Sequence, residues 1–311
     1  MKTPQLLALT GALLFGVAAT RAAVSATIAS LHPRGVSVLA ILSPQGDKKD
    51  DDKKEADASA KKTPPKDDPK VTELLKDLKK IARGKADGDS EGARLLDELA
   101  NKYEGLNSKQ QKAVAKGAGD VFDTAKRKTD EVVLYLSAGE ALSRFGENGA
   151  SELAKAIGKN KFGKKDWSTM RSQLVRMLGR PAVKKYIDTL LDLALKDNDD
   201  QARAKAGEAL GYYAHYDQNV RKNIFEKLVK SLEESYAMSK SNTDPNDLQR
   251  EVWVQRYAAI QDPWMKTMGR LTGQSIKDVQ EWTKWWNEHK RSNWDKEGFR
   301  SSEAPKGDDS K

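Results

Sequence analysis

The chain has 311 residues, of which 38% are hydrophobic, 7% aromatic and 32% charged, with a formal net charge of +9. It contains no cysteine, which excludes disulfides, thiolate metal sites and a cysteine nucleophile. Alanine, leucine, lysine and acidic residues dominate without Val/Ile/Thr alternation, and this composition predicts an all-α fold.

A targeting segment is predicted at residues 1–26. A lysine precedes an apolar run of small residues at 6–19, which is too short for a comfortable membrane span. A peptidase site is predicted at 24–26, with Ala22 and Ala23 as alternatives. We therefore expect an exported protein, periplasmic or extracellular, that is not transmembrane after signal cleavage. An uncleaved N-terminal anchor is the alternative.

Residues 27–70 are predicted to be a disordered, charged linker. From Asp47 to Lys70 lysines and acids alternate in blocks, and Pro64, Pro65 and Pro69 interrupt any helix. Such a segment has too little apolar surface to offset the entropy lost on ordering. We interpret it as a soluble tether, and a specific partner site is the alternative.

Helical periodicity begins at Val71, and Gly84 ends the first predicted helix. Asp89 is expected to cap a second helix that ends at Gly105, and Asn107 to open a third. Because each turn is short and contains glycine, the neighbouring helices are expected to pack antiparallel.

A repeated sequence organises the middle of the chain. Ala-Gly-Glu-Ala-Leu stands at 138–142 and at 206–210, and Leu-Val-Arg-Met-Leu-Gly at 174–179 keeps the same apolar spacing. A second predicted helix follows each copy, and after the middle copy it begins at Pro181. A period of 32 to 36 residues built from two helices predicts hairpins that must stack to bury their apolar faces.

These copies resemble HEAT-type repeats, in which an alanine-leucine-glycine first helix precedes a leucine-rich second helix. The resemblance covers about residues 130–237 and implies a right-handed α-α superhelix, a solenoid of stacked antiparallel helix pairs. A tetratricopeptide-like solenoid, which shares the period, is the alternative. The small Gly139 and Gly207 are expected to let the paired helix approach closely.

The helical repeat domain is predicted to span 71–294 and to end in a tryptophan-rich cap. Trp282, Trp285 and Trp286 fall on or beside one helical face, with Trp294 nearby, similar to the C-terminal element of some exported bacterial HEAT-repeat proteins. We expect these rings to close the apolar end of the array, and a stacking platform for a sugar or peptide is the alternative. A disordered tail is predicted at 295–311.

Basic residues are concentrated between Leu153 and Lys185. Ten lysines and arginines stand there against Asp166 alone, so this window carries a charge of +9. Such a cluster predicts attraction to a polyanion, although a solvated surface is an alternative interpretation. Arg176 is expected to point away from the core. The predicted anion or partner contacts are Lys159, Lys161, Lys164, Lys165 and Arg176.

No catalytic, cofactor-binding or metal-binding residue is predicted. The three histidines, His32, His215 and His289, are far apart, and His215 is expected to be partly buried. The acidic run at 197–200 lacks the glycine and distal glutamate of a calcium loop and is expected to cap a helix. We therefore expect a non-enzymatic scaffold that binds a protein partner on its solenoid surface. The alternative is a binder of an anionic polymer or surface through residues 155–185, without specific nucleic-acid recognition.

Overall fold

The computed structural model describes residues 66–241 and 248–299, and this part of the chain is all-helical, without a strand. The predicted signal segment, the linker up to residue 65 and the tail from residue 300 lie outside the described residues. None of the described helices has the length and apolar character needed to cross a membrane. The α-helices are α1 (Pro69–Arg83), α2 (Asp89–Lys102), α3 (Ser108–Thr124), α4 (Val133–Ser143), α5 (Gly146–Ile157), α6 (Ser168–Gly179), α7 (Ile187–Lys196), α8 (Asp200–Leu210), α9 (Gln218–Lys240), α10 (Leu248–Thr272) and α11 (Val279–His289). Short 3-10 helices are η1 (Ala86–Gly88), η2 (Tyr103–Gly105), η3 (Lys165–Trp167), η4 (Lys184–Tyr186) and η5 (Gly211–His215).

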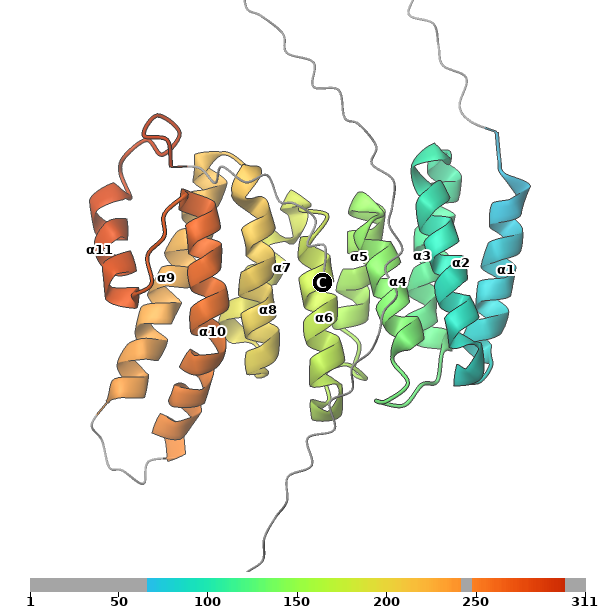
Figure 1. Ribbon diagram of the computed structural model, residues 1–311, viewed down its shortest axis with the longest axis horizontal. Helices are drawn as coiled ribbons and strands as arrows, with labels where there is room; N and C mark the ends of the chain where they lie inside the picture. The colour runs from blue at the N-terminus through green and yellow to red at the C-terminus, as the bar shows by residue number, and fades with distance from the viewer. Residues whose placement is uncertain (1–65, 242–247, 300–311) are drawn as a thin grey trace, which may run out of the picture. The chain divides into compact units, whose positions relative to one another are not determined.

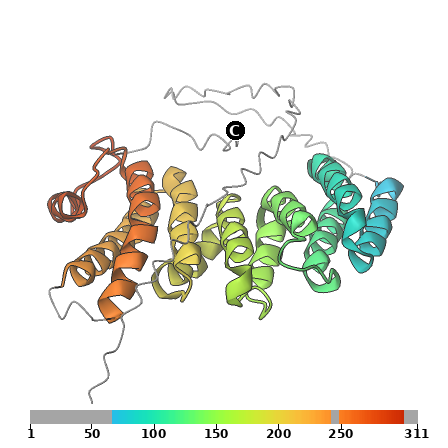
Figure 2. The ribbon, with the colours of Figure 1, turned by 60° about the horizontal axis from the view of Figure 1, so that its bottom comes forward.

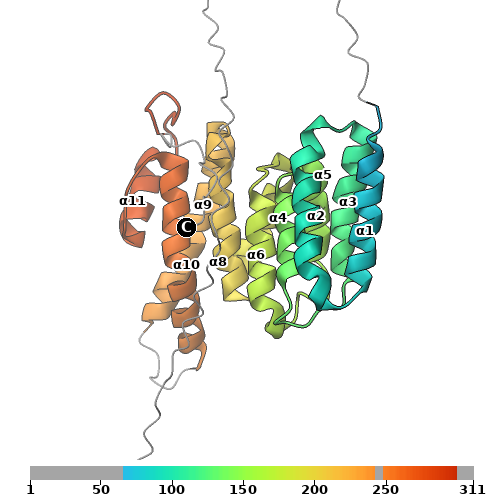
Figure 3. The ribbon, with the colours of Figure 1, turned by 45° about the vertical axis from the view of Figure 1, so that its right-hand side comes forward.

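Two layers of helices follow from the packing. In the even-numbered layer, α2 packs on α4, α4 on α6, α6 on α8 and α8 on α10. In the odd-numbered layer, α1 packs on α3, α3 on α5, α7 on α9 and α9 on α11. Helices that follow one another in the chain also join the two layers, for example α4 with α5 and α7 with α8. Figures 1, 2 and 3 show the helices succeeding one another in chain order.

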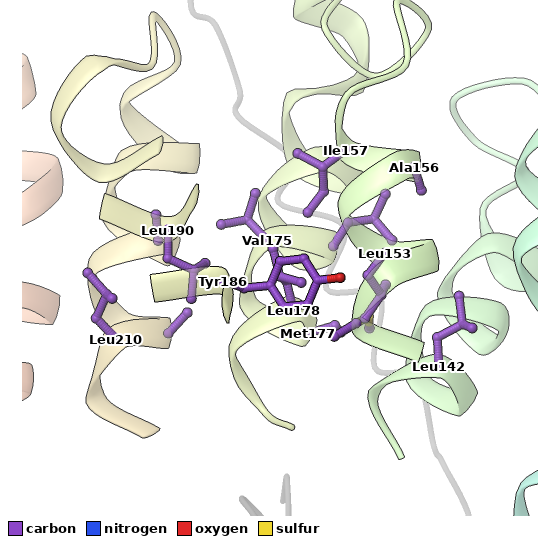
Figure 4. Close-up of a cluster of buried hydrophobic side chains, with 14 of the residues drawn as sticks. Leu142, Leu153, Ala156, Ile157, Val175, Met177, Leu178, Tyr186, Leu190 and Leu210 are labelled. Atoms are coloured by element: carbon purple, nitrogen blue, oxygen red, sulfur yellow. The ribbon is translucent and has the colours of Figure 1, made fainter. Parts of the chain in front are cut away.

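One apolar core runs between the layers. The buried side chains form a single cluster that begins at Val71 in α1 and ends at Trp294 beyond α11. Figure 4 shows its middle part, where Leu153 of α5, Leu178 of α6 and Leu190 of α7 come together. Each helix pair therefore buries its apolar side against neighbouring pairs as well as within itself, and burial of this kind is the main force holding such a stack together.

The apolar stripes of the three predicted copies are confirmed as core. They lie in α4, α6 and α8, which are successive helices of the even-numbered layer. Every stripe position is at most 5% exposed. The positions are Leu134, Ala138, Ala141 and Leu142; Met170, Leu174, Met177 and Leu178; and Ala202, Ala206, Ala209 and Leu210.

The repeated glycines face a different neighbour from the predicted one. A Cβ atom at Gly139 would lie 2.6 Å from Sδ of Met177 in α6, and one at Gly207 would lie 2.0 Å from Nε1 of Trp264 in α10. Both glycines thus admit the next helix of the same layer, and the prediction that they admit the paired second helix was wrong. Successive helices of the chain alternate between the two layers, so the helix closest to each glycine is the next one in its own layer. The spacing of residues in the sequence does not specify this arrangement.

The first helix begins earlier than predicted. Pro69 is the first residue of α1, and the Asp68 carboxylate caps the helix by accepting a hydrogen bond of 2.9 Å from the Lys70 N–H. Proline suits this position because the N–H that it lacks would have no partner inside the helix. The interpretation of Pro69 as a helix breaker, and the linker boundary at residue 70, were therefore wrong.

Pro181 does not start a helix. It lies in the turn after α6, and α7 begins only at Ile187, beyond η4. Ala182, next to it, has a φ of 47°, in the left-handed region that costs a residue with a side chain about 1–2 kcal/mol. The hydroxyls of Tyr216 and Tyr213 donate to the carbonyls of Ala182 and Val183, at 2.8 and 3.0 Å. These bonds hold the turn in its strained form.

Asp89 does not cap α2 as predicted. Its carboxylate is buried and accepts hydrogen bonds of 2.7–3.0 Å from Nε and Nη2 of Arg127, which stands in the connection between α3 and α4. Arg127 also donates to the Gly84 carbonyl at 2.9 Å. These hydrogen bonds to Asp89 outweigh the burial of the guanidinium and raise the pKa of Arg127. The pair fastens the α3–α4 connection to the turn between α1 and α2.

The predicted tryptophan group is buried. Trp282 and Trp294 have no exposed surface, and Trp285 and Trp286 are each 8% exposed. All four rings surround Phe225 of α9, with ring centroids 5.3–5.7 Å from it. Rings enclosed in this way present no free face to a sugar or peptide, so the alternative of a stacking platform was wrong.

Part of the predicted tail belongs to the fold. The buried Arg221 of α9 donates hydrogen bonds to the Phe299 carbonyl and to the Asp295 carboxylate, and also to the Leu271 carbonyl at 2.8 Å. The Phe299 ring lies 5.2 Å from the Trp285 ring, between centroids. Residues 295–299 are therefore packed against the helices, and the boundary predicted at 295 was wrong.

Candidate functional site

A pocket of about 760 Å³ opens between two connections on the same edge of the helical layers. One wall is the connection between α5 and α6 together with the start of α6, and the other is the end of α7 and the first turn of α8. We call it the loop pocket. Its lining residues are Phe162, Gly163, Lys164, Lys165, Ser168, Arg171, Lys196, Asp197, Asn198, Asp199 and Asp200.

The first wall is positioned by a buried aromatic group. Phe162 has no exposed surface and meets Phe122, Tyr135 and Trp167 edge-on, with ring centroids 5.9, 5.7 and 5.4 Å away. Edge-to-face contacts of this kind favour one arrangement of the rings. The anchored ring holds the following exposed residues, beginning with Gly163, at the mouth of the pocket.

The second wall is a helix cap, as predicted from the acidic run. The carboxylate of Asp199 accepts a hydrogen bond of 2.9 Å from the Gln201 N–H at the start of α8. The carboxylate of Asp197 accepts one of the same length from the Asp199 N–H. The first N–H groups of a helix have no partner inside it, so a cap of this kind fixes the start of α8 beside the pocket.

Ion pairs join this wall to neighbouring helices. Nη1 of Arg171 in α6 lies 2.7 Å from Oδ1 of Asp197, and both side chains are mostly shielded from solvent. Nε of Arg256 in α10 lies 2.9 Å from Oδ1 of Asp200. Each carboxylate of the loop pocket is thus engaged by a cation or by a backbone N–H.

Two cations of the pocket have no such partner. Lys164 and Lys165 are exposed, and neither side chain makes a hydrogen bond or ion pair with the residues at 66–241 and 248–299. Lys196 differs, because its ammonium lies 2.8 Å from the Asp192 carboxylate on the same helix. The loop pocket therefore combines carboxylates already in use with two available positive charges.

Of the five predicted contact residues, only Lys164 and Lys165 line the loop pocket. Lys159 is half-buried and forms an ion pair with Asp123 of α3. Arg176 is half-buried in α6, and its Nε atom is shielded from solvent. The expected outward orientation of Arg176 stays a prediction.

Carboxylates outside the basic window reduce its charge. The window contains Asp166 alone, but four of its cations pair with acids that lie before or after it in the sequence. These pairs are Lys155 with Glu152, Lys159 with Asp123, Arg171 with Asp197, and Arg180 with Glu140. The excess of +9 counted along the sequence is therefore much smaller in space, because the fold brings these acids alongside.

Lys161, the fifth predicted contact, is enclosed by the aromatic group. Its ammonium donates to the Tyr135 hydroxyl and lies 4.2 Å from the Tyr135 ring centroid and 4.4 Å from that of Trp167. Burial, together with the charge of Arg127, lowers the pKa of Lys161 below its usual value. The Lys161 side chain therefore packs inside the connection between α5 and α6 and is not a free surface cation.

This lowered pKa predicts a pH dependence of stability. Between the folded pKa of Lys161 and its unfolded value of 10.5, the unfolded chain binds more protons, so the Lys161 contribution to stability rises with pH. The free energy of unfolding of the wild type, minus that of Lys161→Met, should therefore rise from pH 8 to pH 10. Urea denaturation at pH 8, 9 and 10 measures this difference. A difference that stays constant or falls with pH would contradict the assignment.

Neither of the two histidines within the described residues belongs to a group that would hold a metal ion. His215 is exposed, with Nδ1 2.9 Å from the Tyr212 carbonyl oxygen, so the expectation of partial burial was wrong. His289 lies against the Trp285 ring, 4.9 Å between centroids. Within 66–241 and 248–299 no three histidine or acidic side chains gather in a way that would hold a metal ion.

Sequence reasoning considered the two walls of the loop pocket separately. The lysines at 164 and 165 were assigned to a basic cluster and the acids at 197–200 to a helix cap. The order of the helices could have connected the two segments. One segment joins α5 to α6 and the other joins α7 to α8, and such equivalent connections in successive helix pairs lie on the same edge of the layers. Applying that rule places the two segments side by side.

Comparisons with known proteins give no relative. No family model, no curated protein and no solved structure matches the chain.

Proposed function

We propose that the chain is an exported, non-enzymatic scaffold that binds a protein partner through the edge of its helical array containing the loop pocket. The supporting observation is the two-layer packing, in which successive helices of each layer stack on one continuous core. We take this packing as part of a right-handed, HEAT-like solenoid whose tryptophan group closes the C-terminal end. Stacked pairs of this kind present extended surfaces suited to extended partners.

The alternative, binding of an anionic polymer through residues 155–185, has less support. Four of the ten cations in that segment are paired with carboxylates of the fold, and Lys161 is enclosed by aromatic rings. Polymer binding depends on the number of phosphates or other anions that free cations neutralise. The few cations that remain available suit a local contact better than a long anionic track.

Site-specific photocrosslinking tests the scaffold proposal. A benzoylphenylalanine at position 163 stands at the mouth of the loop pocket, where an added side chain has room. The matched control places the same group at position 227, an exposed site on α9 that does not line the pocket. In the native envelope or secreted fraction we expect one saturable protein adduct from position 163 and none from position 227.

Equal labelling from both positions, or no protein adduct from either, would contradict the proposal. An adduct with a polysaccharide or nucleic acid would support the anionic-polymer alternative instead. N-terminal sequencing of the chain recovered from the same fraction tests export, because a start at or near position 27 is expected after removal of residues 1–26.

A further inference from the structure

We infer that the loop pocket recognises an acidic peptide segment, with a carboxylate side chain of the partner held by Lys164 and Lys165 and its backbone N–H groups facing the wall at 197–200. This inference rests on the proposed function, because it names the chemistry of the partner at the same site. It is carried by the distribution of charge and hydrogen-bonding capacity over the two walls.

The first wall supplies donors. Lys164 and Lys165 are exposed and unpaired within the described residues, and their loop is fixed by the buried Phe162 ring. Ser168 adds a hydroxyl at the start of α6. Asp166, the acid next to these lysines in the sequence, is exposed and does not line the pocket. A carboxylate entering here meets two ammonium groups that form no ion pair within the described residues.

The second wall supplies acceptors. Each carboxylate can accept several hydrogen bonds, and the bonds already made by Asp197, Asp199 and Asp200 leave part of that capacity unused. The side chain of Asn198 adds an amide oxygen and an amide N–H. Backbone N–H groups of a bound peptide match this wall, since they are donors without charge.

The same wall disfavours a polyphosphate or a nucleic acid. The phosphates of those polymers offer acceptors only, and their charges would lie beside three carboxylates in a pocket of about 760 Å³. Like charges placed together cost binding free energy and select against the wrong partner. A peptide that alternates carboxylates with neutral amides satisfies both walls at once.

The shielded Arg171–Asp197 ion pair keeps the donor wall and the acceptor wall of the pocket in place. Its nitrogen and oxygen are 2.7 Å apart, and the two side chains are 16% and 7% exposed. The pair ties α6 to the turn before α8, so the donor wall and the acceptor wall keep a fixed separation. The pocket is therefore formed before the ligand arrives, which lowers the entropic cost of binding.

Fluorescence anisotropy with a defined peptide tests the inference. The probe is a fluorescein-labelled decapeptide of alternating glycine and glutamate with an amidated C-terminus, titrated with the full chain at 150 mM salt. We expect saturable binding that the double variant Lys164→Gln/Lys165→Gln weakens about ten-fold, as expected for the loss of two charge-assisted contacts. Unlabelled polyphosphate of equal charge should displace the probe only at much higher concentration than unlabelled peptide.

The matched control is Lys184→Gln/Lys185→Gln. These adjacent lysines are also exposed and belong to the same basic window, but they follow α6, whereas Lys164 and Lys165 precede it. The twelve residues of α6 separate the two pairs by roughly 18 Å along the helix axis. Because both variants remove the same charge, the control should bind the peptide within two-fold of the wild type.

Absence of peptide binding, equal weakening by both double variants, or displacement by polyphosphate at the lower concentration would each overturn the inference. The scaffold proposal fails separately. A partner that crosslinks from position 163 with unchanged yield in the Lys164→Gln/Lys165→Gln background contradicts the acidic-peptide inference alone. Peptide binding without any crosslinked partner sinks the scaffold proposal.

Discussion

Arg221→Met is expected to lower the free energy of unfolding by about 3 kcal/mol, the lower end of the cost of removing one partner of a buried ion pair. The Arg221 side chain has no exposed surface and donates to the carbonyls of Tyr216, Leu271 and Phe299 and to the Asp295 carboxylate. Methionine fills the space but donates nothing, so the Leu271 carbonyl loses its partner in the interior. The Asp295 side chain is 30% exposed and can regain water, which keeps the cost at the lower end.

Urea denaturation followed by far-ultraviolet circular dichroism measures this change. The matched control is Lys227→Met, which removes an exposed cation from the same helix and should change the free energy of unfolding by less than about 0.5 kcal/mol. A similar small effect for both variants would show that Arg221 does not hold α9, α10 and residues 295–299 together.

Gly207→Ala is expected to lower the free energy of unfolding by about 2 kcal/mol. The added Cβ would lie 2.0 Å from Nε1 and 2.1 Å from Cδ1 of Trp264. That indole is fully buried and donates to the Arg203 carbonyl at 3.2 Å, so it cannot move aside easily. Overpacking of this kind costs about 3 kcal/mol, and the better helix propensity of alanine offsets about 1 kcal/mol of it.

The equivalent substitution in the earlier copy is the control. At Gly139 the added Cβ would lie 2.6 Å from Sδ of Met177 and 3.1 Å from Cδ2 of Leu174. Because a methionine side chain is flexible and adapts to its surroundings, Gly139→Ala should leave stability within about 1 kcal/mol of the wild type. Chemical denaturation of the two variants side by side measures the difference, and equal destabilisation would contradict the distinction between a rigid and a flexible contact.

The sequence was sufficient where local periodicity determines the structure. The stripes in α4, α6 and α8 repeat with a helical period, so their burial could be predicted without knowing which helix they meet. The all-helical class followed from the same patterns. Asn107 as the cap of α3 was also predictable, because a cap acts on a residue only three positions away.

Features that depend on distant partners could not be predicted. Arg127 and Arg221 were passed over because charged residues are usually exposed, and their partners Asp89 and Asp295 lie 38 and 74 residues away. Only the packing shows that each guanidinium is buried and joins separate segments.

The loop pocket was missed for a related reason. Its two walls are separated by an entire helix pair, and no spacing in the sequence connects Lys164 with Asp199. Lys159 and Lys161 do not line the pocket. Lys159 pairs with Asp123 and Lys161 packs beside Tyr135, and sequence spacing does not reveal such tertiary contacts. Charge counted along the chain indicated the segment that forms one wall of the pocket, but not which of its side chains line the cavity.

The aromatic group around Phe225 has a consequence for how unfolding is observed. Four of the seven tryptophans of the chain, Trp282, Trp285, Trp286 and Trp294, belong to it. Tryptophan fluorescence therefore reports mainly on the unfolding of the C-terminal helices. The amide signal in circular dichroism reports on every helix equally. Coincidence of the two denaturation curves is a direct measure of whether the array melts as one cooperative unit or loses its ends first.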